Sequence, residues 1–141
     1  MACRLRWRYA PSQELNIASL VLGQNGIWGD LPRLSDDGIA RFGGALAAYK
    51  RVRDDVTAAT LIRSGTVSGG PEIYEKINPE TGRGVVSVFA GAMGTYAYVT
   101  RSRVSAEFWA MPGVAVTPLP GGEARVDVTF EEPGGKCIFF G

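Results

Sequence analysis

The feature of the sequence that most constrains the fold is a change of hydrophobic period at Pro71. From there to the end of the chain, apolar residues tend to recur at every second position, and residues that favour turns interrupt them about every 8–12 positions, which is typical of an antiparallel sandwich or barrel. In the clearest case, Arg125–Phe130, apolar and polar residues alternate, so one face of that strand is expected to meet water. We therefore predict a mainly β protein of the α+β class, with an antiparallel β-sandwich over residues 66–141.

Seven strands are expected after residue 70. By residue number they are 72–77, 84–90, 95–101, 104–111, 114–117, 125–130 and 136–140. The sequence Asn78–Gly82 contains the proline and glycine of a tight turn, so the first two strands should form a hairpin. Gly91–Gly94 is predicted to close a second hairpin, between the second and third strands.

The part of the chain before this region predicts a strand, a loop and one long helix. Ile17–Leu22 is a short apolar run without polar alternation, which is typical of a strand covered on both faces. Ser35 is a good N-cap, so the helix should begin near Asp36 and continue to residue 58. We expect residues 1–58 to form this strand-loop-helix segment after a lead-in with little structure of its own over residues 1–14. Residues 59–65 are expected to be a linker to the sandwich.

The predicted helix has an apolar stripe that must be covered. Its members recur at steps of three and four residues and are Ile39, Phe42, Leu46, Tyr49, Val52 and Val56. Leaving such side chains in water would forfeit about 1.5–3 kcal/mol for each large one. The cover is either the β-rich remainder of the chain or something outside it, and a strand with two open edges favours pairing across a two-fold axis. We therefore expect a homodimer through the exposed strand-helix segment.

The composition removes several kinds of catalysis. The chain has no histidine, which excludes Ser-His and Cys-His catalysis and the commonest transition-metal ligand. Carboxylates remain, but a retaining glycosidase needs two of them about 5–5.5 Å apart. Asp36 and Asp37 are successive helix residues and point apart, and Glu72 and Glu75 should face opposite sides of a strand. No catalytic residue, metal or cofactor is therefore predicted.

Charge and cysteine content also limit the function. The net charge is +1, so the chain as a whole is not drawn to nucleic acid or acidic membranes, and Arg4, Arg6 and Arg8 are interpreted as an edge strand or a frayed terminus. Cys3 and Cys137 lack the close spacing of a zinc or redox site, and their spacing does not establish a disulfide. No run reaches the roughly 18 apolar residues of a membrane span, and the first residues contain no apolar core of a secretory signal. As the sequence stands we expect a cytoplasmic protein, or a secreted one if the chain is a fragment of a longer precursor.

Four residues of the loop after the predicted strand are candidates for ligand binding. They are Gln24, Asn25, Trp28 and Asp30. They follow the carboxyl end of a buried strand, where α/β folds place binding groups, and Trp and amide side chains together can stack on a sugar ring and bond its hydroxyls. In the alternative interpretation, Trp28 is a packed anchor and Asn25–Gly26 is a turn.

Three stretches of the sequence resemble the carboxyl-terminal part of α-galactosidase-like, melibiase-type glycoside hydrolases. They are LVLGQNGIWGDLPRLSDDGIARFGGALAAYKRVRDDV, PEIYEKINPETGRGVVSVFA and VTFEEPGGKCIFFG. The resemblance implies that the last barrel strand and its helix lead into an antiparallel β-sandwich, and that residues 23–30 form the loop after the eighth strand, on the rim of the sugar site. The family's two catalytic aspartates come from earlier barrel strands, which are not in this chain, so the resemblance assigns no catalytic residue here.

The function that this resemblance implies is an accessory carboxyl-terminal region of a glycoside hydrolase, catalytically incomplete by itself, with carbohydrate as its partner. The alternative is a freestanding carbohydrate-binding or adhesion-type β-sandwich, in which aromatic side chains stack on sugar. The candidates for stacking are Tyr74, Tyr96, Tyr98 and Trp109, although sandwiches need large inward residues and a place in the core is favoured for them. A structural domain with neither function is the third interpretation.

Overall fold

The computed structural model of the chain describes residues 10–23, 34–67 and 70–141. Within these residues the helices are α1 (Ala10–Leu20) and α2 (Asp36–Ala58). The strands are β1 (Ile62–Ser64), β2 (Glu72–Ile77), β3 (Gly84–Ala90), β4 (Gly94–Val99), β5 (Phe108–Ala110), β6 (Val114–Pro118), β7 (Ala124–Phe130) and β8 (Gly134–Phe140). All seven strands expected after residue 70 are present, as β2 to β8, and β2 and β3 have the predicted bounds.

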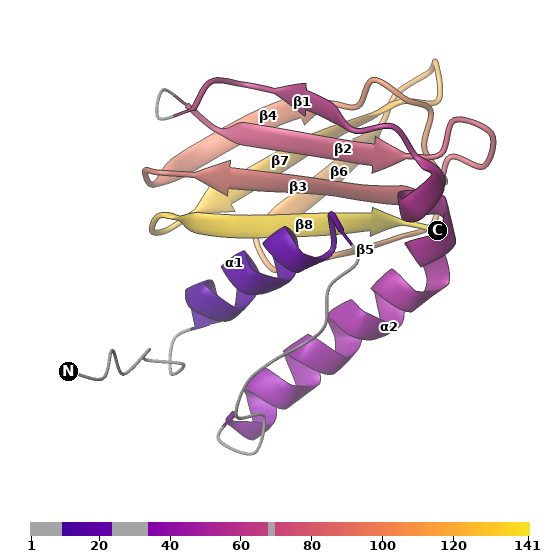
Figure 1. Cartoon of the computed structure of the whole chain (residues 1–141). Coiled ribbons are helices and arrows are strands. Elements are labelled where there is room, and N and C mark those ends of the chain that lie inside the picture. The colour runs from indigo at the N-terminus through magenta and orange to yellow at the C-terminus, as the bar shows by residue number, and fades with distance from the viewer. Residues whose placement is uncertain (1–9, 24–33, 68–69) are drawn as a thin grey trace.

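The strands form two antiparallel sheets that pack face to face. The larger sheet has the order β1-β2-β3-β8-β5 and the smaller sheet the order β4-β7-β6. Both helices lie on the outer face of the larger sheet, so the layers are helices, larger sheet and smaller sheet (Figure 1). The prediction of an antiparallel β-sandwich in an α+β protein is confirmed.

One hydrophobic core fills the space between the two sheets. From β7 it receives Val126, Val128 and Phe130, the apolar half of the alternation that predicted this strand. Arg125 and Thr129 of the same strand are exposed, which confirms that one face of it meets water. The larger sheet contributes Ile73, Ile77, Val86, Val88, Ile138 and Phe140.

The central strands β3 and β8 are buried on both faces. Val86 and Phe140 belong to the core between the sheets, whereas Val85, Cys137 and Phe139 belong to a second core beneath the helices. A strand with two buried faces needs apolar residues at successive positions. This explains why the end of β8 shows no polar alternation in the sequence.

Helix α2 begins as predicted, because the Ser35 hydroxyl accepts a hydrogen bond from the Gly38 amide at 3.2 Å. Its buried face contains small residues as well as part of the predicted stripe. The buried positions are Gly38, Ala45, Ala48, Val52 and Val56. Ile39, which was expected in the stripe, is 51% exposed. Small residues allow the helix to lie close to its neighbours, and a Cβ atom at Gly44 would already be 3.5 Å from the Trp109 ring.

The predicted strand at residues 17–22 is wrong. Residues 17–20 belong to α1 and the next residues to the turn after it, and α1 begins at Ala10, inside the expected lead-in. Periodicity alone does not distinguish a short apolar strand from a buried helix segment. In the described chain no strand pairs with these residues. Their backbone groups must therefore find hydrogen-bond partners elsewhere, and a helix provides these partners internally. Ile17, Ala18 and Val21 are buried in the second core.

Helix α1 and the turn after it are fixed to the larger sheet by polar contacts as well as by this core. The Ser87 hydroxyl of β3 donates to the Ala18 carbonyl at 2.8 Å, and the Lys76 ammonium of β2 donates to the Leu22 carbonyl at 3.3 Å. The larger sheet and α1 also cover the buried face of α2. The open-edged strand on which the predicted homodimer rested is therefore absent from the described residues, and that route to a dimer is withdrawn.

The two predicted hairpins have different outcomes. β2 and β3 do form a hairpin, with Ile77 opposite Gly84. β3 and β4 do not, because β3 pairs with β2 and β8 whereas β4 pairs with β7. Residues 91–93 instead carry the chain from one sheet to the other, and Gly94 at the start of β4 has a positive φ of 148°. β1, which pairs with β2, lies within the segment expected to be a linker.

Candidate functional site

The residues predicted to bind a ligand lie outside the described part of the chain. Gln24, Asn25, Trp28 and Asp30 all fall within 24–33. Their proposed place on the rim of a sugar site therefore stays a prediction.

The four aromatic candidates for sugar stacking do not form one surface. Tyr98 is buried in the core between the sheets, which confirms a core role for it, and Tyr96 packs at the margin of the same core. Trp109 packs against the second core, beneath the helices. Tyr74 lies on the outer face of the larger sheet, because the alternate residues of β2 are the buried ones. A platform made of all four rings is excluded.

A buried carboxylate, Glu75, connects the two sheets. It lies on the inward face of β2 and is 0% exposed. Its Oε2 accepts hydrogen bonds from the Tyr98 hydroxyl and the Arg101 amide, both at 2.8 Å, and its Oε1 accepts one from the Ser102 amide at 2.9 Å. Burial and, secondly, the hydrogen bond to Glu75 raise the pKa of Tyr98 to about 12. Both oxygens have donors from the protein, as a structural carboxylate requires.

Sequence reasoning missed the role of Glu75, although the sequence contains the signal for it. The alternation in β2 places Ile73, Glu75 and Ile77 on one face, and that face is apolar at its other two positions. A charged residue at an inward position must have hydrogen-bond partners, because an unpaired buried charge is very costly.

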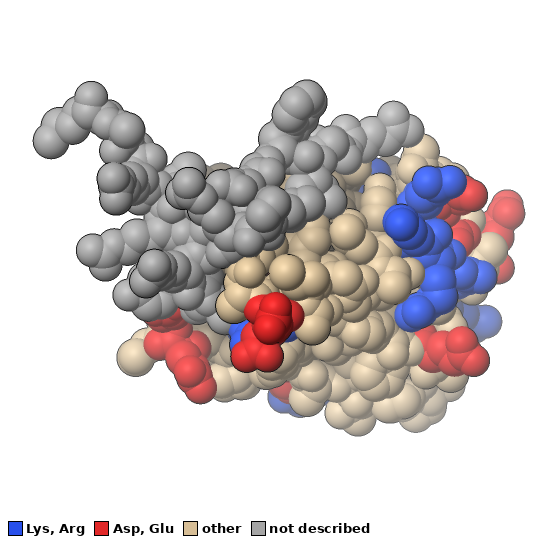
Figure 2. Space-filling model, turned by 90° about the horizontal axis from the view of Figure 1, so that it is seen from below, with Lys and Arg blue, Asp and Glu red and all other residues tan. Residues whose placement is uncertain are grey.

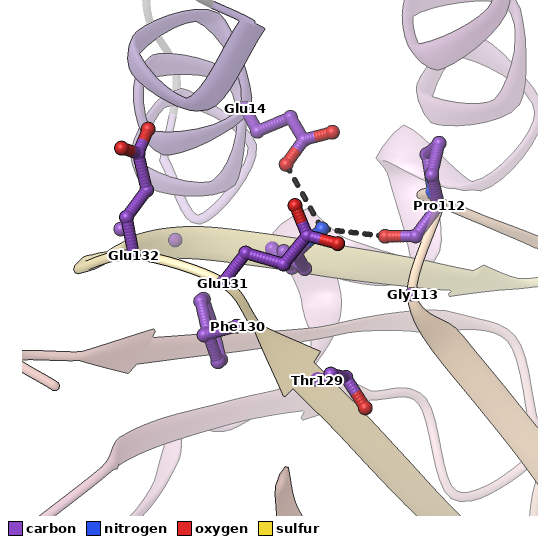
Figure 3. Close-up of a pocket in the computed structure, with 10 residues that line it drawn as sticks. Glu14, Pro112, Gly113, Thr129, Phe130, Glu131 and Glu132 are labelled. Carbon is purple, nitrogen blue, oxygen red and sulfur yellow. Dashed lines mark hydrogen bonds and ion pairs between the residues drawn. The ribbon is translucent and has the colours of Figure 1, made fainter. Parts of the chain in front are cut away.

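An acidic cleft lies between the start of α1 and the end of the smaller sheet (Figure 3). Its volume is about 540 Å³. It is lined by Glu14, Pro112, Gly113, Thr129, Phe130, Glu131, Glu132, Gly134, Gly135 and Lys136. The Lys136 ammonium pairs with Glu14 Oε2 at 3.1 Å and also donates to the Pro112 carbonyl, and both charged side chains are mostly buried.

The acidic cleft does not present a pair of free carboxylates on a rigid element. Glu14 is paired with Lys136. Glu131 and Glu132 are exposed residues of the bend between β7 and β8, and their side chains diverge in Figure 3. Within the described residues, no group of three His, Cys, Asp or Glu side chains could hold a metal ion. The cleft can therefore attract a cationic or hydroxyl-rich group, but its geometry does not define a reaction.

An aromatic groove adjoins the acidic cleft on the other side of the β7–β8 bend. Its volume is about 830 Å³. It is lined by Leu15, Gly70, Glu72, Phe89, Ala90, Gly91, Ala92, Tyr96, Pro133 and Gly134. The Tyr74 hydroxyl donates to Glu72 Oε2 at 2.6 Å, which holds that carboxylate in place and raises the pKa of Tyr74. The groove is thus lined by one oriented carboxylate and by two partly buried rings, Phe89 at the margin of the second core and Tyr96 at the margin of the core between the sheets.

Cys137 is not placed to act as a nucleophile. It is free and fully buried in the second core, where burial raises the pKa of its thiol far above the ordinary value. The thiolate is the reactive form of cysteine. Cys3 lies outside the described residues.

The molecular surface seen from below in the orientation of Figure 1 carries charges of both signs. Figure 2 shows Lys and Arg side chains gathered toward the end of the molecule where α2 ends, with Asp and Glu side chains beside them. Two ion pairs involve the last turns of α2: Arg83 with Asp55, and Arg53 with Asp54, each at 3.4 Å. Neither described helix is long and apolar enough to cross a membrane.

Comparisons of the chain with protein-family models, with curated proteins and with solved structures found no match. The described residues therefore define the protein by its fold: a two-sheet antiparallel sandwich with two helices packed over the larger sheet. Its candidate site is the pair of hollows beside the β7–β8 bend.

Proposed function

We propose that this chain is an accessory carboxyl-terminal region of a glycoside hydrolase, without turnover of its own. The observation that carries the proposal is the order of the elements: α2 leads into an antiparallel sandwich and packs on the outer face of its larger sheet. This is the order that the resemblance implies for the helix and sandwich after a barrel. The proposal rests on residues 36–141, since the strand expected before them is a helix.

The roles of the carboxylates support a region without catalysis. Glu75 is held by three donors in the core. Asp55 accepts hydrogen bonds from the side chains of Asn78 at 3.0 Å and Thr81 at 2.8 Å. Glu14 is paired with Lys136. Each has a structural partner, whereas a retaining glycosidase needs two carboxyl groups about 5–5.5 Å apart across a sugar.

The test is to identify the protein that carries this region in its source cells. An antibody raised against the purified chain is used on a cell extract and on the culture medium. We expect it to detect a species much larger than 141 residues and to precipitate activity toward an aryl α-galactoside. A single species of about the size of this chain, with no associated glycosidase activity, would contradict the proposal.

The aromatic groove favours a second candidate, a freestanding carbohydrate-binding module. Phe89 and Tyr96 can offer ring surface to a sugar, and Glu72 can accept hydrogen bonds from its hydroxyls. Titration of the chain with a glycan panel, followed by amide chemical shifts, tests this. Glu72→Gln should weaken binding by about tenfold or more, whereas Glu131→Gln in the acidic cleft should not, since a hydrogen bond to a charged group contributes about 1.5–3 kcal/mol and each 1.4 kcal/mol is about tenfold. Equal effects of the two changes, or no glycan bound at millimolar concentration, would rule the groove out.

A further inference from the structure

The open edge of β4 differs from the other sheet edges of the described chain. β1 and β5, which end the larger sheet, have three residues each, and β6, at the other end of the smaller sheet, finishes at Pro118. β4 has six residues, and residues 91–100 contain no charge and no proline. Proteins usually protect open edges by short strands, charges or proline, because a bare edge pairs with other strands. Only β4 lacks these features among the described edges.

The hydrogen-bond pattern shows which groups of β4 point to the open edge. The Thr129 amide of β7 donates to the Gly113 carbonyl at 2.8 Å, toward β6 and away from β4. Thr95, which lies opposite Thr129, is therefore in a non-hydrogen-bonded pair, and its own N–H and C=O point away from β7. The Thr100 amide donates to the Ala124 carbonyl of β7 at 2.9 Å, as this alternation requires. Thr95, Ala97 and Val99 thus present their backbone groups to the edge.

We propose that β4 pairs antiparallel with β4 of a second copy across a two-fold axis. When a strand pairs with its own copy, residues that lie opposite each other have side chains on the same face of the sheet. Because side chains alternate between the faces along a strand, the two opposite residues must both have even numbers or both have odd numbers. The register with Thr95 opposite Ala97 of the second copy joins the outward-pointing groups of both strands. It also brings Val99, 47% exposed, near Met93 of the second copy, which lies in the bend before β4 and is 71% exposed.

The chemistry of the edge favours a second copy as its occupant. No like charges meet in the paired region, since residues 91–100 are uncharged in both copies. The two three-stranded sheets become one sheet of six strands, and the exposed apolar side chains at the ends of β4 cover each other. Pairing along one short strand buries little surface, so the dimer should be reversible and should dissociate on dilution. This interface is distinct from the strand-helix segment and does not depend on the proposed function.

A matched pair of lysine substitutions tests the interface. Ala97 on β4 and Ala115 on β6 are both exposed, and both lie directly opposite Asp127 of β7, one on each side. Ala97→Lys places two charges near the two-fold axis and should raise the dimer dissociation constant by about tenfold or more. Ala115→Lys makes the same change at the other edge and should leave it unchanged. Sedimentation velocity over a wide range of concentrations of the full chain measures both.

Hydrogen exchange gives a second readout that does not use a variant. The amides of Thr95, Ala97 and Val99 should be protected at high protein concentration and exchange quickly on dilution. The amides of Tyr96 and Tyr98, which face β7, should be protected at both concentrations. A chain that stays monomeric at millimolar concentration would overturn the proposal, and so would a dimer that Ala97→Lys and Ala115→Lys weaken equally.

Discussion

The clearest test of the energetics of this fold is the removal of the Glu75 carboxylate. Glu75→Ala leaves the Tyr98 hydroxyl without its acceptor in the core, and frees the Arg101 and Ser102 amides. A hydrogen bond to a charged group contributes about 1.5–3 kcal/mol. The two amides lie near the surface and can turn partly to water, so we count the Tyr98 bond in full and the other two in part. The expected loss of unfolding free energy is about 3–5 kcal/mol.

Glu75→Gln is the milder companion of this change. This change keeps the volume of the side chain and one acceptor oxygen. The new NH2 group, however, must face groups that are themselves donors: either the Ser102 amide at the position of Oε1 or the two groups that donate to Oε2. We expect it to cost about 1–3 kcal/mol. Glu80→Ala is the control, because Glu80 is an exposed residue of the turn after β2 and its loss should change stability by less than about 0.5 kcal/mol.

Urea unfolding of the four proteins, followed by tryptophan fluorescence and far-ultraviolet circular dichroism, measures these differences. If Glu75→Ala leaves too little folded protein to fit, Glu75→Gln carries the test. A loss below about 1 kcal/mol for Glu75→Ala, or a Glu75→Gln protein as stable as the original, would refute the view that this carboxylate holds the two sheets together.

Three further predictions concern pH, packing and activity. The pKa of Tyr98 is raised to about 12 in the folded chain, so the unfolded chain loses this proton first. The contribution of Tyr98 to stability should be intact below pH 10 and fall by on the order of 2 kcal/mol up to pH 12, and Tyr98→Phe should remove this part of the alkaline loss of stability. Phe139→Ala should cost about 3–5 kcal/mol in a denaturant melt, and Phe108→Ala, at a residue 48% exposed, much less; similar losses would contradict the described second core. The purified chain should not hydrolyse aryl α-galactosides, and turnover that disappears on changing a single Asp or Glu of this chain would show that it is an enzyme by itself.

The parts of the fold that follow from local rules could be predicted from the sequence. Alternation in β7, turn residues between β2 and β3 and the cap at Ser35 each depend on neighbours close in sequence. The pairing of β4 could not be predicted, because a glycine-rich connection serves a hairpin and a change of sheet equally well. The prediction of a strand at residues 17–22 was wrong for a similar reason. The apolar character of these residues required burial, but not a particular backbone conformation.

The candidate site was less accessible to sequence reasoning than the fold. The loop chosen for its Trp and amide side chains lies outside the described residues. The acidic cleft joins Glu14, Pro112 and Lys136, which are far apart in sequence and come together only because α1 docks beside β8. Glu75 lies outside these hollows and its role was also missed, although the pattern of β2 alone places it on the inward face.

The double burial of β8 connects the helices to the sandwich energetically. Phe139 and Phe140 are adjacent and both fully buried, yet Phe139 belongs to the core beneath the helices and Phe140 to the core between the sheets. A substitution that loosens one of these cores therefore disturbs β8, and β8 also contributes to the other core. The helices cannot be lost without exposing Val85, Cys137 and Phe139 on the two central strands of the larger sheet. For this reason α2 belongs to the same cooperative unit as the strands after it, and a segment beginning at residue 66 would leave one face of its larger sheet uncovered.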